Sequence, residues 1–192
     1  MKKIPTLYER EFEHHRVVKI LNKVTDGCED VASGKGVATI KYDGACCAII
    51  EGLLYKRYDA KKGRPVPEGA IKCQEEADPI TGHFPCWVKC DRTNPYDKWF
   101  YSAYDNTEKP LENGTYEAIG KHFQTNSYGL ENDILIRHGQ KIVEVGRTIE
   151  ELKEFLSSNY VEGIVFWVDG EPKCKIKRSD FGLEWGGSVS EL

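Results

Sequence analysis

The chain has 192 residues and a formal net charge of −4, with 40% hydrophobic and 30% charged residues. This length predicts one domain, and the acidic balance argues against strong non-specific binding of nucleic acid. The sequence has no apolar run near the length of a membrane span, so we expect a cytoplasmic protein without membrane contact.

The first half of the chain predicts strands joined by loops. RVVKILNKV (16–24) is strand-like, and DGCEDVASGKG (26–36) is a loop rich in turn-forming residues. Residues 44–58 form a predicted hairpin that turns at Glu51-Gly52. Residues 60–113 hold most of the prolines, which predicts an irregular insertion with one short strand around CWVKC.

The second half predicts a strand, a hairpin and a helix in turn. GTYEAIG (114–120) alternates as a strand does, and DILIRHGQKIVEV (133–145) indicates a hairpin. TIEELKEFLSSN (148–159) predicts a helix, because Thr148 and Glu151 can form a capping box ahead of an apolar stripe.

The last predicted elements are two strands, VEGIVFWV (161–168) and KCKIK (173–177), joined at Asp169-Gly170. Together the elements predict an α+β fold dominated by antiparallel sheet.

The seven cysteines are an odd number, which favours reduced thiols over a disulfide framework. Cys73, Cys86 and Cys90 lie near one another in the sequence but lack a second close pair of ligands. We therefore do not expect a zinc cluster there.

Charged residues stand in or beside apolar strands at four places. Lys41 and Asp43 lie in KYDG, Glu117 in TYEAIG and Glu162 in EGIVF, while KCKIK alternates lysines along one face. Each alone is typical of a solvated strand end or a paired charge. All four in this order indicate a site.

These segments resemble the ordered motifs of the covalent nucleotidyltransferases, which include polynucleotide ligases and mRNA capping enzymes. The motifs are KYDG, YKR after the hairpin turn, YEAIG, VEGIVF and CKIKR. In that superfamily the motif lysine attacks the α-phosphate of a nucleoside triphosphate, becomes a lysyl-nucleotide, and releases pyrophosphate.

The chain is most similar to the small ATP-dependent 5′-to-3′ RNA ligase family, over roughly residues 35–185. The shared segments are the double cysteine after KYDG, DPITGHFPCWV, EAIGKHFQTNSYGL, LIRHG and GLEW. The resemblance implies one ATP-grasp-like nucleotidyltransferase (ligase adenylylation) domain over 1–192, and we expect no oligonucleotide-binding barrel.

The resemblance also implies roles for individual residues. Lys41 is the nucleophile, Glu117 binds the ribose, and Glu162 lies by the metal and the lysine. Lys175 and Lys177 hold the α-phosphate. Nucleotide contacts follow for Asp43, which can hold metal-bound water, and for Arg57, with Lys56 as the alternative.

The base pocket needs an apolar wall. Ile164 follows Glu162 by two residues, so strand alternation places both on one face and makes Ile164 the candidate. The second wall comes from Leu135, Ile136 or His138, and the sequence does not choose among them.

The function implied is an ATP-dependent RNA ligase for RNA repair, using Mg²⁺, or Mn²⁺ in its place. Its partner is RNA with 5′-phosphate and 3′-hydroxyl ends, and we predict no protein partner. A GTP-using capping-type nucleotidyltransferase and a non-catalytic nucleic-acid end-binding protein remain alternatives. The insertion offers RNA-binding candidates, namely Lys61, Lys62, Arg64, Lys72, Lys89, Arg92 and Lys98 with Trp87, Trp99, Phe100 and Tyr101.

Overall fold

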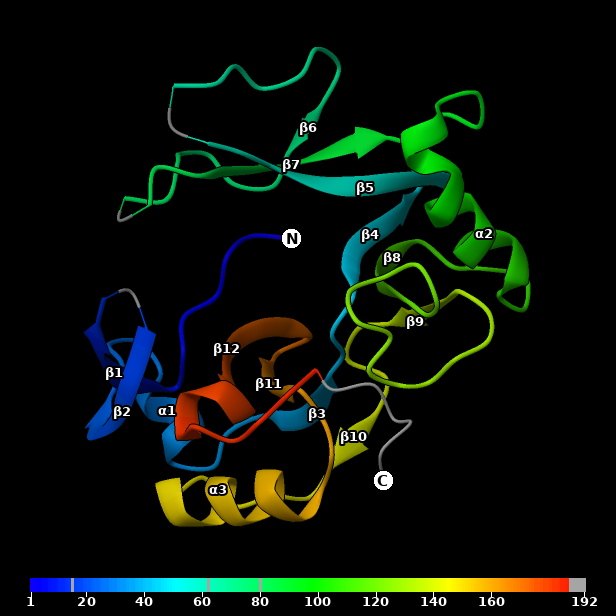
Figure 1. Ribbon diagram of the computed structural model, residues 1–192. Coiled ribbons are helices and arrows are strands. Elements are labelled where there is room, and N and C mark those ends of the chain that lie inside the picture. The colour runs from blue at the N-terminus through cyan, green and yellow to red at the C-terminus, as the bar shows by residue number, and fades with distance from the viewer. Residues whose placement is uncertain (15, 62, 80, 187–192) are drawn as a thin grey trace. The chain divides into compact units, whose positions relative to one another are not determined.

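A computed structural model describes residues 1–14, 16–61, 63–79 and 81–186. The fold is mixed α+β, with antiparallel sheets and few helices (Figure 1). The chain divides into two compact units. Among the described residues, unit 1 holds 1–3 and 43–138, and unit 2 holds 4–42 and 139–186. That the whole chain is one domain stays a prediction.

Unit 1 is built on a six-stranded sheet with the order β6-β7-β5-β4-β8-β9. Its strands are β4 (Ala45–Ile50), β5 (Leu53–Ala60), β6 (Ile71–Lys72), β7 (Phe84–Lys89), β8 (Gly114–Ile119) and β9 (Ile134–Arg137). A 3₁₀ turn, η1 (Pro95–Asp97), leads into helix α2 (Lys98–Asn106). Ala103 of α2 packs with Cys47, Tyr116 and Leu135 in the core of this unit.

Unit 2 contains a four-stranded sheet with the order β10-β3-β11-β12 and a separate hairpin, β1-β2. Its strands are β1 (Tyr8–Glu13), β2 (Arg16–Val24), β3 (Val37–Lys41), β10 (Ile142–Val143), β11 (Gly163–Val168) and β12 (Glu171–Lys177). Its helices are α1 (Glu29–Ala32), α3 (Ile149–Ser158) and the 3₁₀ turn η2 (Arg178–Phe181).

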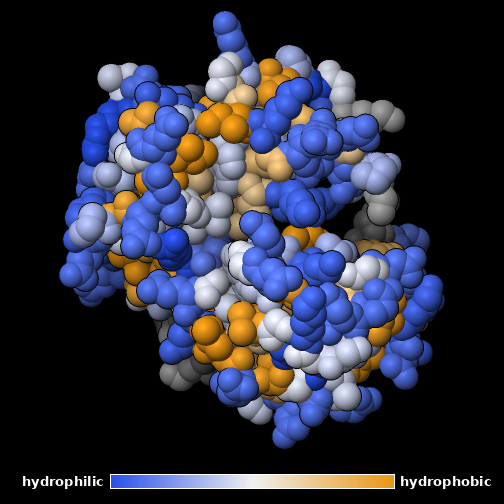
Figure 2. Space-filling view, turned by 180° about the vertical axis from the view of Figure 1, so that it is seen from behind, coloured by the Kyte–Doolittle hydropathy of each residue, from blue (hydrophilic) through white to orange (hydrophobic). Residues whose placement is uncertain are grey.

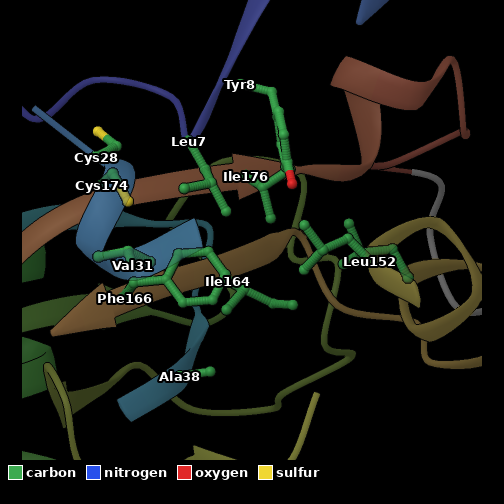
Figure 3. Packing of buried hydrophobic residues seen from close by; sticks show 11 residues of the cluster. Leu7, Tyr8, Cys28, Val31, Ala38, Leu152, Ile164, Phe166, Cys174 and Ile176 are labelled. Carbon is green, nitrogen blue, oxygen red and sulfur yellow. The ribbon is translucent and has the colours of Figure 1, made fainter. Parts of the chain in front are cut away.

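One face of the four-stranded sheet is the core of unit 2. Ile164 and Phe166 of β11 and Ile176 of β12 point into it, where Leu152 of α3 meets them (Figure 3). All four side chains are fully buried. Alternate residues of β11 and β12 are therefore committed to the core, and the residues between them face the other way.

Several predicted elements are confirmed. β4 and β5 form the expected hairpin, and β8 lies where GTYEAIG predicted a strand. Helix α3 begins with the capping box of Thr148 and Glu151. β11 and β12 form a hairpin through Asp169-Gly170, where both residues have the positive φ that such a turn requires.

The predicted hairpin at 133–145 is wrong. β9 pairs with β8 in unit 1, whereas β10 pairs with β3 in unit 2. Two short strands with a glycine between them fit a local turn, but long-range partners decide their pairing here.

The insertion at 60–113 is less irregular than predicted. β7 confirms the short strand around CWVKC, but helix α2 was missed. Its start carries a recognisable signal, because the Asn94 side chain caps the backbone N–H of Tyr96 and Pro95 is the first residue of η1. The predicted loop at 26–36 likewise contains the short helix α1.

Apolar side chains lie in small groups among polar ones on the surface drawn in Figure 2. Exposed Phe12, Val18 and Ile142 contribute to the accessible apolar surface of unit 2. In the part of the chain that the structure describes, no helix has the length and apolar character needed to cross a membrane.

Gly163 lies where two strands of the four-stranded sheet pack closely together. A Cβ at this position would collide with the backbone carbonyl of Ile176. We expect Gly163→Ala to lower the free energy of unfolding by about 1 to 3 kcal/mol, because the ladder must shift to admit the methyl group. Urea denaturation measures the loss. Ser157→Ala on the exposed side of α3 is the control, and equal stability of the two variants would contradict the packing argument.

Candidate functional site

Three lysines lie on the face of the four-stranded sheet that is not the core. Lys41 pairs with Gly163 across β3 and β11, and Gly163 pairs in turn with Lys177 on β12. Val165 is the direct partner of Lys175. Directly paired residues share a face of a sheet, so the register brings Lys41, Lys175 and Lys177 to one surface.

Glu162 supplies the negative charge at this surface. It immediately precedes β11, and its carboxylate forms an ion pair with Lys41 Nζ. The Glu162 side chain is only 12% exposed and that of Lys41 24% exposed, so water screens the pair weakly. The structure therefore brings together four of the predicted site residues, which we call the lysine cluster: Lys41, Glu162, Lys175 and Lys177.

The surroundings within the lysine cluster disfavour the positive charge of Lys175. Burial, followed by the positive charges of Lys41 and Lys177, lowers the pKa of Lys175 to about 8, although Glu162 opposes the shift. A lysine in water has a pKa near 10.5. The folded protein thus holds an ammonium group where the surroundings disfavour its charge.

The backbone around Lys175 is held from both sides. On one side Val165 of β11 is its ladder partner. On the other, Lys175 N–H donates to the Pro5 carbonyl at 3.0 Å and its carbonyl accepts from Leu7 N–H at 2.8 Å. The segment before β1 thus covers the outer edge of β12, which fixes the position of the lysine.

Arg178 is a site-supporting residue that the sequence did not suggest. It is 8% exposed, and its guanidinium donates to the backbone carbonyls of Leu156, Asn159 and Glu184. Its own backbone N–H donates to the Glu162 carbonyl at 2.9 Å. Arg178 therefore ties the end of α3 to the residue that pairs with Lys41. The only sequence signal is its place directly after the lysine motif.

Ile164 does not join the cluster, and the prediction that it shares a face with Glu162 is wrong. It pairs with Ile176 and Ile40 and is fully buried in the core (Figure 3). Glu162 lies before the first residue of β11. Strand alternation therefore cannot be counted from Glu162 to find the face on which Ile164 lies. Its half-buried neighbour Val165, the direct partner of Lys175, is an apolar side chain on the lysine face.

Asp43 and Gly44 belong to unit 1, where the segment after β8 fixes their backbone. Asp43 N–H donates to the Tyr128 hydroxyl at 2.6 Å, and the Gln124 side chain donates to the Gly44 carbonyl at 2.9 Å. A Cβ on Gly44 would collide with the Ala118 carbonyl, so glycine is the residue that lets β4 meet β8 this closely.

Glu117 also lies in unit 1, on the face of the six-stranded sheet opposite the core. Its carboxylate meets His138 Nε2 at 2.9 Å, and His138 Nδ1 meets the Thr115 hydroxyl at 3.0 Å. Among the three candidates for a second base wall, Leu135 packs in the core of unit 1. Ile136, the direct partner of Glu117, and His138 remain on the polar face.

For the predicted basic residue that contacts the nucleotide, the geometry favours Arg57 over Lys56. Lys56 forms an ion pair with Asp97, which is 1% exposed, and its ladder partner is the core residue Cys47. Arg57 lies one residue on and faces the other way, toward Cys46, where burial raises the pKa of the thiol and the positive charge of Arg57 opposes that rise. Its Nε is buried without a hydrogen-bond partner among the described residues, while its terminal nitrogen meets Asp59 at 3.2 Å.

The insertion at 60–113 exposes several basic side chains and one aromatic ring. Lys62 lies outside the described residues, and the other six basic candidates are exposed. Trp87 is buried, and Phe100 and Tyr101 pack against the unit 1 core. Trp99 is 37% exposed and stacks on His122 with a centroid distance of 3.3 Å, which makes it the aromatic candidate with an accessible surface.

A scan of protein-family models and a search of curated proteins found no match to this chain. The geometry of the two units therefore has to support a functional assignment by itself.

The strained charge on Lys175 predicts a stabilising substitution. Because the folded-state pKa lies below the unfolded value, the charged lysine destabilises the fold below pH 8, and this cost disappears as pH rises from 8 to 10.5. We expect Lys175→Met to raise the free energy of unfolding at pH 7 by up to about 3 kcal/mol.

Urea denaturation at pH 7 and pH 10 measures both effects, and the gain should shrink at the higher pH. The exposed lysine two residues earlier on the same strand provides a matched control, and Lys173→Met should change stability by less than about 0.5 kcal/mol. A Lys175→Met protein less stable than the wild type at pH 7 would contradict the assignment.

Proposed function

We propose that this chain is an ATP-dependent RNA ligase that joins 5′-phosphate and 3′-hydroxyl ends of RNA through a lysyl-AMP on Lys41 and an adenylylated RNA. The observation that carries the proposal is the lysine cluster, in which Lys41 is paired with Glu162 beside two further lysines on one face of a sheet. An ATP-grasp-like nucleotidyltransferase fold is part of the proposal.

The cluster suits an anionic ligand. Its three lysines and one carboxylate carry a net charge of about +2. Burial, and after it repulsion from Lys41 and Lys177, lowers the pKa of Lys175. A phosphate placed against Lys175 and Lys177 turns this repulsion into attraction. The same two cations then stabilise the charge that develops on the α-phosphate during transfer.

Lys41 is the nucleophile in this proposal. Its free amine attacks the α-phosphorus of ATP, a nitrogen–phosphorus bond forms, and the bond to the bridging oxygen of the leaving pyrophosphate breaks. Lys41 is an ammonium in its ion pair, so it first passes one proton to the Glu162 carboxylate, which is already in contact with Nζ. The nitrogen loses a second proton to solvent as its bond to phosphorus forms. Because the acceptor is already held against the nucleophile, less entropy is lost in reaching the transition state, and the rate rises.

Glu162 also fits the role of a magnesium-site residue. Its carboxylate offers hard oxygen ligands, and magnesium in proteins is commonly bound through one or two carboxylates and several waters. Mg²⁺, or Mn²⁺ in its place, would neutralise charge on the triphosphate when bound. Asp43 offers a further carboxylate in unit 1, and we propose that it contacts metal-bound water.

Two of the remaining nucleotide contacts are assigned to residues of unit 1. Glu117 has a half-buried carboxylate suited to ribose hydroxyls. Arg57 has an unpaired buried Nε that suits an acceptor on the substrate. For the apolar wall beside the base we propose Val165 in place of Ile164, because Val165 shares the face of Lys175.

Two further steps complete the reaction. The 5′-phosphate of RNA attacks the phosphorus of lysyl-AMP, which breaks the nitrogen–phosphorus bond and regenerates Lys41. The 3′-hydroxyl then attacks the activated 5′-phosphorus, forms the phosphodiester and releases AMP. One ATP is thus converted to AMP and pyrophosphate for each junction.

Label transfer tests the first step. Incubated with Mg²⁺ and α-labelled ATP, the wild-type protein should retain label on a denaturing gel, and Lys41→Ala should retain none. Lys175→Ala and Glu162→Ala should reduce the rate roughly 10²- to 10³-fold, because each removes a group that stabilises charge in the transition state.

Lys173→Ala is the matched control, since Lys173 is exposed on the same strand, and it should label at the wild-type rate. Labelling by GTP in preference to ATP would redirect the proposal to capping-type chemistry. RNA binding without any label would support an end-binding protein instead.

Ligation of matched strands tests the substrate. A nick with 5′-phosphate and 3′-hydroxyl ends should be sealed far faster in RNA than in DNA, since only RNA carries the 2′-hydroxyl that such a site can sense. Trp99→Ala should weaken RNA binding by about 1 to 3 kcal/mol if a base stacks on the exposed ring. Sealing all-DNA nicks at the RNA rate would overturn the RNA assignment.

A further inference from the structure

Unit 1 contains a cluster of metal-ligating side chains that the ligase proposal does not use as such. The sulfur of Cys46, a carboxylate oxygen of Glu117 and a ring nitrogen of His138 all lie within 4.8 Å of one another. All three residues are half-buried. Sequence spacing could not suggest the cluster, because the three residues are far apart in the chain.

The sheet itself brings these residues together. Cys46 of β4 and Glu117 of β8 are direct ladder partners, so their side chains share a face. Glu117 pairs next with Ile136 of β9, and His138 lies two residues further along. His138 N–H donates to the Thr115 carbonyl at 3.0 Å, which continues the ladder beyond β9. The three side chains thus come from three adjacent strands.

We propose that Cys46, Glu117 and His138 form a binding site for a divalent transition-metal ion, of which Zn²⁺ fits best. Zinc accepts sulfur, nitrogen and carboxylate oxygen at about 2.0 to 2.3 Å, and three protein ligands leave a fourth tetrahedral position open. Mg²⁺ fits poorly, because thiolate and imidazole are soft or borderline ligands. The site is therefore chemically distinct from the one proposed at Glu162.

The orientation of His138 supports the site. Metal-bound histidines commonly use the second ring nitrogen for a hydrogen bond that fixes the ring. Here Nδ1 meets the Thr115 hydroxyl at 3.0 Å, which directs Nε2 toward Glu117. The Nε2–Oε2 distance of 2.9 Å would widen to roughly 3.4 Å around a tetrahedral ion, a change of one small side-chain movement.

Charge also favours a divalent ion. Metal binding displaces the Cys46 thiol proton to solvent, so thiolate and carboxylate together balance the two charges of the ion. Glu117 serves both this site and the proposed ribose contact. Zn²⁺ bound here would therefore compete with the nucleotide, a consequence that rests on the proposed function, whereas the metal site itself does not.

Cobalt titration of chelator-treated protein tests the site without measuring activity. The wild-type protein should bind one equivalent of Co²⁺ with a sulfur-to-cobalt charge-transfer band, and Zn²⁺ should displace it. Cys46→Ser should lose the band, and His138→Ala should bind at least about tenfold more weakly. Thr115→Val leaves all three ligands in place but removes the partner of Nδ1, and should weaken binding roughly tenfold.

His122→Ala is the matched control, because His122 forms the same kind of pair with Asp133 at 2.7 Å outside the cluster. It should bind Co²⁺ as the wild type does, and circular dichroism should show that every variant is folded. A charge-transfer band of wild-type strength in Cys46→Ser, or a wild-type protein that binds neither Co²⁺ nor Zn²⁺ at micromolar concentration, would overturn the proposal. Neither result bears on label transfer to Lys41.

Discussion

The ion pair between Lys41 and Glu162 is the contact on which the site in unit 2 depends. Three lysines share one face of a sheet, and this carboxylate is the counter-charge that the described contacts place against Lys41. Removing Glu162 would take this counter-charge away from Lys41, and breaking a partly buried pair costs more than the pair contributes. Glu162 only partly offsets burial and the charges of Lys41 and Lys177, which together lower the pKa of Lys175.

Such an arrangement is stable because the rest of unit 2 holds it. The opposite face of the sheet is a packed core that includes Ile164 and Ile176. The segment before β1 covers the edge of β12, and buried Arg178 fixes the backbone of Glu162. A fold optimised for stability alone would not place a half-buried lysine of lowered pKa on this face. Perturbed groups of this kind gather at functional sites, which is consistent with the phosphate contact that we propose for Lys175.

The sequence predicted several features that local chemistry decides, although it missed helix α2 despite a local signal, and it missed pairings that distant partners decide. The lysine alternation in β12, the capping box of α3 and the turn at Asp169-Gly170 are local, and each is confirmed. The hairpin at 133–145 failed because its two strands find partners in different sheets. Ile164 was assigned to the wrong face because Glu162 precedes the strand. The roles of Arg178 and of the Cys46–Glu117–His138 cluster could not be predicted, because they depend on contacts between residues that are far apart in the sequence.

The central claim concerns which lysine reacts. Lys175 is the alternative nucleophile, because its pKa of about 8 leaves more free amine near neutral pH than a lysine in water has. Our account assigns Lys175 to the phosphate and Lys41 to the attack. Tandem mass spectrometry of the wild-type protein after incubation with ATP and Mg²⁺ decides between them. We predict AMP on the peptide that contains Lys41, and AMP on Lys175 instead would contradict the account.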